Sequence, residues 1–251
     1  MDTPALVVLI ASLLAALVAA LGVLPLRLRG AVHRSWVQSA QAIAGGLMLG
    51  AGYVLAVEGL RSFERPLLLV LGMFGGGLYT FFVQTYAGID ESTAPSRRAV
   101  LRQSLLHGSM EGVAIGAASV VDLNLGLVLA GALALHNIAE ALILSSHLRR
   151  LGVPGATTMS LAVLGKLGQP ALAVITFLIG RDVAGFESAV LGFGAGSLVF
   201  LVIAELLPTA YHPPTPSEPD DDPPAQDIEV RIALLISLAT AAVIVFEEML
   251  R

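Results

Sequence analysis

Apolar stretches long enough to cross a membrane recur from one end of this chain to the other. Hydrophobic residues make up 56% of the 251 residues and charged residues only 13%, about half the fraction of roughly 25% that is typical of soluble proteins. About twenty apolar residues in a helix span the hydrocarbon core of a bilayer, and the helix satisfies its own backbone polar groups there. The sequence therefore predicts an all-α, polytopic membrane protein.

Charge-free runs separated by polar residues predict eight spans. Their approximate ranges are 5–26, 37–57, 66–87, 99–121, 123–145, 157–180, 189–207 and 232–246. The sixth is interrupted by Lys166, Gln169 and Pro170, and the eighth is short for a span. The first lacks a basic segment before it and a small-residue cleavage site after it, so we expect a span and not a signal peptide. Residues 213–229 are acidic and proline-rich, which predicts a disordered loop.

Arginines are distributed unevenly between the two sides that eight spans define. One side holds Arg27, Arg29, Arg34, Arg97, Arg98, Arg102, Arg149, Arg150 and Arg231, and the other holds Arg61, Arg65, Arg181 and Arg251. Because cytoplasmic loops carry the excess of basic residues, we expect both termini outside and the acidic loop in the cytoplasm. These arginines indicate topology and not a nucleic-acid surface. The absence of cysteine excludes a disulfide framework and a thiolate metal site.

Two of the predicted spans each carry a histidine four residues before a glutamate. The pairs are His107 with Glu111 and His136 with Glu140, and residues four apart share one face of a helix. The very short connection near Asp122 predicts an antiparallel hairpin, and the two pairs lie about equally far from it in sequence. At about 1.5 Å per residue that separation is about 20 Å, close to the middle of a bilayer. The four side chains can therefore meet at one depth.

Ionisable side chains at this depth are costly and indicate a functional site. Neutral imidazole and ionised carboxylate suit Zn²⁺, Fe²⁺, Mn²⁺ or Co²⁺, whereas Ca²⁺ and Mg²⁺ prefer oxygen ligands alone. We therefore predict a transition-metal site and no organic cofactor. Hydrogen-bonded packing of buried His and Glu side chains is the alternative, and the matched depth of two pairs argues against it.

The segments around these residues resemble the ZIP (Zrt/Irt-like) family of divalent-metal transporters, in its prokaryotic branch. Residues 107–116 read HGSMEGVAIG, where the family has HNxPEGxAxG or HSxxDGxAIG, and residues 136–142 read HNIAEAL, where it has HNIPEGLA. ELLPTAYH at 205–212 is similar to the family's ELLPEAxH, and GGLMLG at 45–50 is similar to a run whose Met lies along the pathway. Met48, Glu205 and His212 are therefore candidate pathway residues.

The resemblance implies a binding centre that often holds two metals bridged by shared carboxylates. His107, Glu111, His136 and Glu140 would form the primary site, and the positions of Gly108, Asn137 and Gln169 would form the second, with Glu140 shared. Gly108 has no side chain to offer, and Gln169 replaces a glutamate that many members carry. One well-formed metal site and a second that is lost or very weak are therefore expected.

Lys166, the single lysine of the chain, lies three residues before Gln169 on the same helical face. One interpretation is that it reaches an interface or lines a wet cavity. The other is that its ammonium group replaces the lost second metal ion and offsets the charge of Glu140 or Glu111.

The function that the resemblance implies is import of a divalent metal, Zn²⁺ first and Fe²⁺, Mn²⁺, Cd²⁺ or Co²⁺ also considered, by an elevator-like form of alternating access. The protein would be one ZIP-like domain over residues 1–251, with inverted pseudo-symmetric repeats, and a homodimer in a bacterial inner membrane. A non-transporting metal sensor or structural protein is the first alternative, and a membrane metal hydrolase is the second. His212 and Asp220–Asp222 would capture or release ions, or the acidic run would be a solvated linker.

Overall fold

The computed structural model describes residues 2–29, 34–61, 65–87, 97–150, 152–183, 185–211 and 225–250. These residues form helices α1 (Thr3–Arg29), α2 (Arg34–Arg61), α3 (Pro66–Ala87), α4 (Arg97–Val121), α5 (Leu123–Arg150), α6 (Gly155–Leu164), η1 (Gly165–Leu167), α7 (Gly168–Asp182), α8 (Phe186–Leu201), η2 (Val202–Leu206), α9 (Leu207–Tyr211) and α10 (Ala225–Leu250). Eight stretches of the described chain are long and apolar enough to cross a membrane. The predicted all-α fold with eight spans is confirmed.

The last helix is longer than the sequence analysis predicted. It runs over 26 residues from Ala225 to Leu250, where the charge-free run gave only 232–246. Residues 225–229, expected in a disordered loop, form its first turns instead, and the acidic Asp227 lies where the positive end of the helix dipole favours a carboxylate. The rest of the acidic loop and His212 lie outside the described residues.

Helices α6 and α7 form one span with a short 3₁₀ turn, η1, between them. Pro170 has no N–H to donate to the carbonyl group of Lys166, so a regular helix cannot continue through this point. Lys166 lies within the turn and Gln169 two residues after it, and both side chains are buried. The predicted interruption of the sixth span is therefore confirmed, and it points two polar side chains into the bundle.

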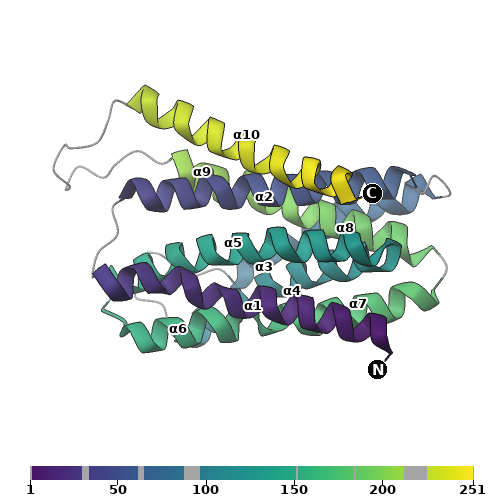
Figure 1. The fold of residues 1–251 in the computed structure, drawn as a ribbon, viewed down its shortest axis with the longest axis horizontal. Helices are drawn as coiled ribbons and strands as arrows, with labels where there is room; N and C mark the ends of the chain where they lie inside the picture. Colours follow the sequence, from purple (N-terminus) through teal and green to yellow (C-terminus); the bar gives the residue numbers. More distant parts are fainter. Residues whose placement is uncertain are drawn as a thin grey trace.

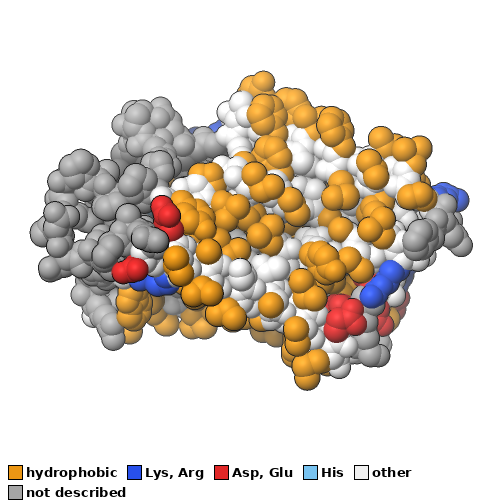
Figure 2. All heavy atoms as spheres, turned by 90° about the horizontal axis from the view of Figure 1, so that it is seen from above, with side chains coloured by type: hydrophobic (Ala, Val, Ile, Leu, Met, Phe, Trp, Pro, Cys, Tyr) orange, Lys and Arg blue, Asp and Glu red, His pale blue; other side chains and the backbone are white. Residues whose placement is uncertain are grey.

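The helices run roughly parallel or antiparallel along one axis, and both chain termini lie at the same end of the bundle (Figure 1). On the face seen in Figure 2, hydrophobic side chains cover the middle of the molecule, and the coloured charged groups lie toward its two ends. This distribution fits a bundle whose sides contact lipid and whose ends contact water.

The hairpin of α4 and α5 is at the centre of the bundle. Asp122 joins the two helices, and its Oδ1 atom accepts hydrogen bonds from the backbone N–H groups of Asn124 (2.7 Å) and Leu125 (3.1 Å). A carboxylate in this position caps the new helix and neutralises part of its dipole. The cap lets α5 begin directly after α4, which fixes the two helices as antiparallel neighbours, as predicted.

Glycines on α4 bring α7 close to the hairpin. A Cβ atom placed on Gly112 would collide with the backbone carbonyl oxygen of Gln169 and would lie 3.0 Å from the backbone nitrogen of Ala173. Small residues allow membrane helices to approach in this way. Because Gly112 directly follows Glu111, the same close approach carries the η1–α7 segment to the four predicted ligands.

Replacing Gly112 with Ala should separate α4 from α7 and destabilise the protein, with a loss of roughly 1–3 kcal/mol, the usual cost of overpacking. The measurement is thermal unfolding of the purified protein in detergent. Gly131→Ala in α5 is the matched control, since a Cβ atom there meets nothing within 4 Å. Equal melting temperatures for the two variants would contradict the close-packing role of Gly112.

Candidate metal centre

Four side chains from α4 and α5 converge near the middle of the two helices. One ligand atom from each of His107, Glu111, His136 and Glu140 lies within 4.8 Å of the others. The His107 Nε2 atom is 3.3 Å from Glu111 Oε1 and 3.9 Å from Glu140 Oε2. The His136 Nε2 atom is 3.4 Å and 3.6 Å from the same two oxygens. The matched depth predicted from helix geometry is therefore observed.

The four nitrogen–oxygen separations are close to the edge length of a tetrahedral coordination shell. Ligand atoms about 2.0–2.2 Å from a zinc ion are about 3.3–3.6 Å from one another. The four nitrogen–oxygen distances, 3.3, 3.4, 3.6 and 3.9 Å, require shifts of a few tenths of an ångström at most. Two imidazoles and two carboxylates also form a donor set that borderline transition metals accept.

Several nitrogen and oxygen atoms of the four ligand side chains are buried and lack a hydrogen-bond partner. The Nε2 atoms of His107 and His136, the Oε2 atoms of Glu111 and Glu140, and the Nδ1 atom of His136 make no hydrogen bond within the described chain. Unsatisfied polar atoms in a protein interior are rare and each costs free energy. Such a concentration of lone pairs indicates that the site is built to receive a ligand, and a metal ion would satisfy most of these atoms at once.

Lys166 extends from η1 into this cluster. Its Nζ atom donates a hydrogen bond of 2.7 Å to Glu111 Oε1 and contacts Glu140 Oε2. Its side chain is only 4% exposed, so the ammonium group neither reaches an interface nor faces water. The interpretation that Lys166 reaches an interface is wrong, because the two carboxylates inside the bundle give this cation closer partners than an interface would.

Two of the residues predicted for a second metal site, Asn137 and Gln169, are in contact. The Asn137 Nδ2 group donates to Gln169 Oε1 at 2.9 Å and to the backbone carbonyl oxygen of Ala15 at 3.0 Å. Both side chains are fully buried. The contact with Ala15 brings α1 to the centre, and no sequence pattern predicted it, because a backbone carbonyl has no residue signature.

The candidate pathway residues lie in different surroundings. Met48 is fully buried in the apolar core that α2 forms with α5 and α8. Glu205 lies on η2, a π-helical turn, and its Oε2 atom accepts a hydrogen bond of 2.9 Å from Gln84 Nε2. Such π turns often occur at functional sites. A pathway role for either residue remains a prediction.

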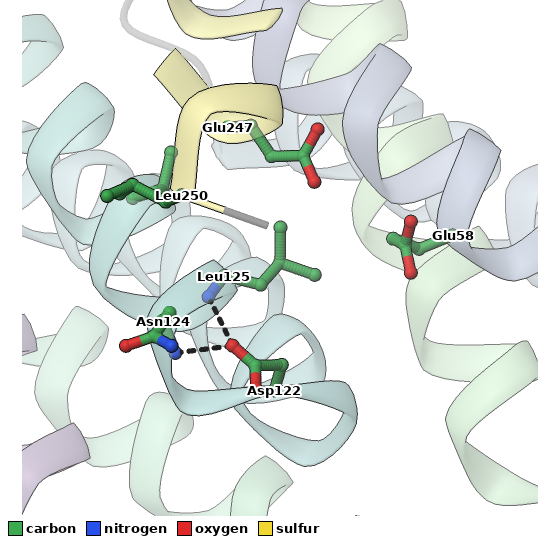
Figure 3. Close-up of a pocket in the computed structure, with 7 residues that line it drawn as sticks. Glu58, Asp122, Asn124, Leu125, Glu247 and Leu250 are labelled. Atoms are coloured by element: carbon green, nitrogen blue, oxygen red, sulfur yellow. Dashed lines mark hydrogen bonds between the residues drawn. The ribbon is translucent and has the colours of Figure 1, made fainter.

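A separate open pocket of about 300 Å³ lies where the ends of α2, α5 and α10 meet. Glu58 and Glu247 line it together with Asp122, whose carboxylate is engaged in capping α5 (Figure 3). Asp122 is eleven residues from Glu111 along α4, which corresponds to about 16 Å of helix. The pocket is therefore distinct from the His/Glu cluster and lies at the end of the bundle that holds the termini.

Fold and site together define a multi-pass membrane protein with a buried group of metal-ligand side chains. No protein-family model matches the chain. The chain is 30% identical over 194 residues, 73% of its length, to an Arabidopsis thaliana protein named "Putative zinc transporter". It spans 31% of the length of that protein. This similarity, which is consistent with the ZIP resemblance of the motifs, confirms the chain as a relative of metal transporters.

Removing one ligand should abolish tight metal binding. We expect His136→Ala to weaken binding of Co²⁺ by roughly 100-fold or more, since loss of mere supporting contacts at metal sites already costs 10–100-fold. The measurement is titration of the purified protein with Co²⁺, whose visible spectrum reports tetrahedral coordination. His147→Ala on the same helix is the control and should bind as the unmodified protein does. Unaltered binding by His136→Ala would exclude this ligand set.

Proposed function

We propose that this protein carries divalent transition-metal ions across a membrane, with Zn²⁺ as the principal substrate. The observation that supports the proposal best is the convergence of four ligand side chains from α4 and α5, whose ligand atoms lie within 4.8 Å of one another and whose imidazole Nε2 atoms have no hydrogen-bond partner. The relative's name adds support for zinc among the ions considered. Fe²⁺, Mn²⁺, Cd²⁺ and Co²⁺ remain further candidate substrates of the same site.

Exposure of the ligands differs along the axis of the bundle. The side chains of Glu111 and His136 are 0% exposed, whereas those of His107 and Glu140 are 12% and 23% exposed. His107 is farther than Glu111 from the turn at Asp122, and Glu140 is farther from it than His136. Because α4 and α5 are antiparallel, His107 and Glu140 lie toward the same end of the bundle. The more accessible half of the site thus faces the end of the bundle without the termini.

The excess of arginines at that end supports a cytoplasmic orientation for it. We therefore interpret this arrangement as a state with access from inside, one of the two that alternating access requires. Metal would enter from outside, lose most of its water, bind neutral His107 and His136 and ionised Glu111 and Glu140, and leave toward the cytoplasm. Protons compete with a metal for the same lone pairs, so protonation would assist release.

A metal sensor or structural protein would bind metal at the same side chains without flux. A hydrolase would need an open coordination position for water and a separate catalytic base. Here both carboxylates already point at the candidate metal position, and Lys166 holds both of them. This arrangement favours binding and release over hydrolysis.

Metal uptake into proteoliposomes tests transport directly. We expect saturable uptake of Zn²⁺ by the unmodified protein and background uptake by His107→Ala/Glu140→Ala, because two of four ligands are lost. Fe²⁺, Mn²⁺ and Cd²⁺ in the same assay give the substrate preference, and His147→Ala serves as the matched control. Absence of flux from folded protein that still binds metal would support the sensor or structural alternative.

Single introduced cysteines test the orientation, since the chain has none of its own. Asn124 and Arg149 are exposed at opposite ends of α5. A membrane-impermeant maleimide added to intact cells should label Asn124→Cys, and it should label Arg149→Cys only after permeabilisation. The reverse pattern would place the termini inside and make the described state outward-facing.

A further inference from the structure

We propose that the Lys166 ammonium group is a permanent, tethered cation of the metal centre, which occupies the position of a second metal ion and limits the site to one ion. This inference rests on the proposed function, because it concerns the same site. Its consequences for the number of bound ions are separate from whether transport occurs.

The carboxylate oxygens that would bind metal are the oxygens that Lys166 contacts. Glu111 Oε1 lies 3.3–3.4 Å from the two imidazole Nε2 atoms and 2.7 Å from Lys166 Nζ, and neither Nε2 atom accepts a hydrogen bond from Nζ. Glu140 Oε2 is likewise close to both imidazoles, at 3.9 and 3.6 Å, and in contact with the ammonium group. The two oxygens therefore bridge two cation positions. The imidazoles complete the first position, and Nζ fills the second.

Gly108 lies directly beside the Lys166 side chain. A Cβ atom placed on Gly108 would lie 3.4 Å from the Cα and Cδ atoms of Lys166 and 3.4 Å from the carbonyl oxygen of Gly165. A side chain at position 108 would therefore begin in van der Waals contact with the lysine side chain. The position without a ligand side chain, Gly108, and the added cation, Lys166, are thus direct neighbours.

Charge explains why a second ion is excluded. With neutral imidazoles, two carboxylates and one ammonium group leave the metal-free centre with a single net negative charge. One divalent ion makes the centre singly positive, and a second would add two further positive charges in a buried site, where like charges repel strongly. Gln169 supplies no negative charge that would offset them.

Lys166 also stabilises the centre when no metal is bound. The Glu111 side chain is fully buried, and a buried carboxylate without a cationic partner is strongly destabilising. The ammonium group supplies that partner from within the chain. A tethered cation cannot leave with the cargo, so the carboxylates keep a counter-charge after release.

Metal stoichiometry in purified protein tests the inference. Equilibrium dialysis against Zn²⁺, with elemental analysis, should give one ion per chain for the unmodified protein and for Gln169→Glu, whose new carboxylate would pair with Lys166. Lys166→Ala/Gln169→Glu, which removes the ammonium group and restores an anionic ligand, should bind two. Two ions in the unmodified protein, or one in the folded double variant, would overturn the inference. No bound ion in the unmodified protein would overturn the proposed metal site itself.

A second measurement needs no variant. Lys166 is the single lysine of the chain, so protein labelled with ¹³C,¹⁵N-lysine gives one assigned side-chain signal in detergent micelles. Saturation with Co²⁺ should shift or broaden this signal strongly, because the metal and Nζ would share two carboxylate oxygens. A signal that does not change while Co²⁺ binds with a tetrahedral spectrum would overturn the inference and leave the metal site intact.

Discussion

Two carboxylates inside the bundle, the fully buried Glu111 and the partly buried Glu140, impose the constraint on which the rest of the structure depends. Charge in a low-dielectric bundle is tolerated only with partners at close range. Here the partners come from three places: His107 on α4, His136 on α5 and Lys166 on η1. The helices must therefore meet at one depth, whatever else they contact. A packing error at this level would leave a charge unpaired, so the centre specifies the arrangement of the helices around it.

The backbone around the metal centre has two features that meet this requirement, a break in the sixth span and a close approach of two helices. Lys166 reaches the carboxylates because a 3₁₀ turn and Pro170 interrupt the sixth span at that depth. The turn comes close enough because Gly112 of α4 lets the backbone of Gln169 approach without an intervening side chain. Glycine and proline residues, which weaken an ordinary helix, here place a cation where the charge of the centre needs it.

The same cluster has features that suit binding and features that suit release. Two imidazole Nε2 atoms without hydrogen-bond partners, beside two carboxylates, favour a metal ion, whereas an ammonium group on the same carboxylates weakens their hold on it. A site for storage or structure gains nothing from a competing cation. A site that must give up its ion does, because the lysine replaces part of the stabilisation that the departing metal removes. This balance is the physical argument for transport.

The spans and the convergence of four ligands could be predicted from the sequence alone. Both follow from local properties: apolar length sets the spans, and a fixed rise per residue with a short connection at Asp122 sets the depth of His107, Glu111, His136 and Glu140. Two features depended on tertiary packing: the hydrogen bond from Asn137 to the Ala15 carbonyl and the contact of Lys166 with both carboxylates. Each joins helices that are far apart in the chain. Hydrophobic periodicity does not encode which helix faces meet, or which of several charged partners a flexible side chain contacts.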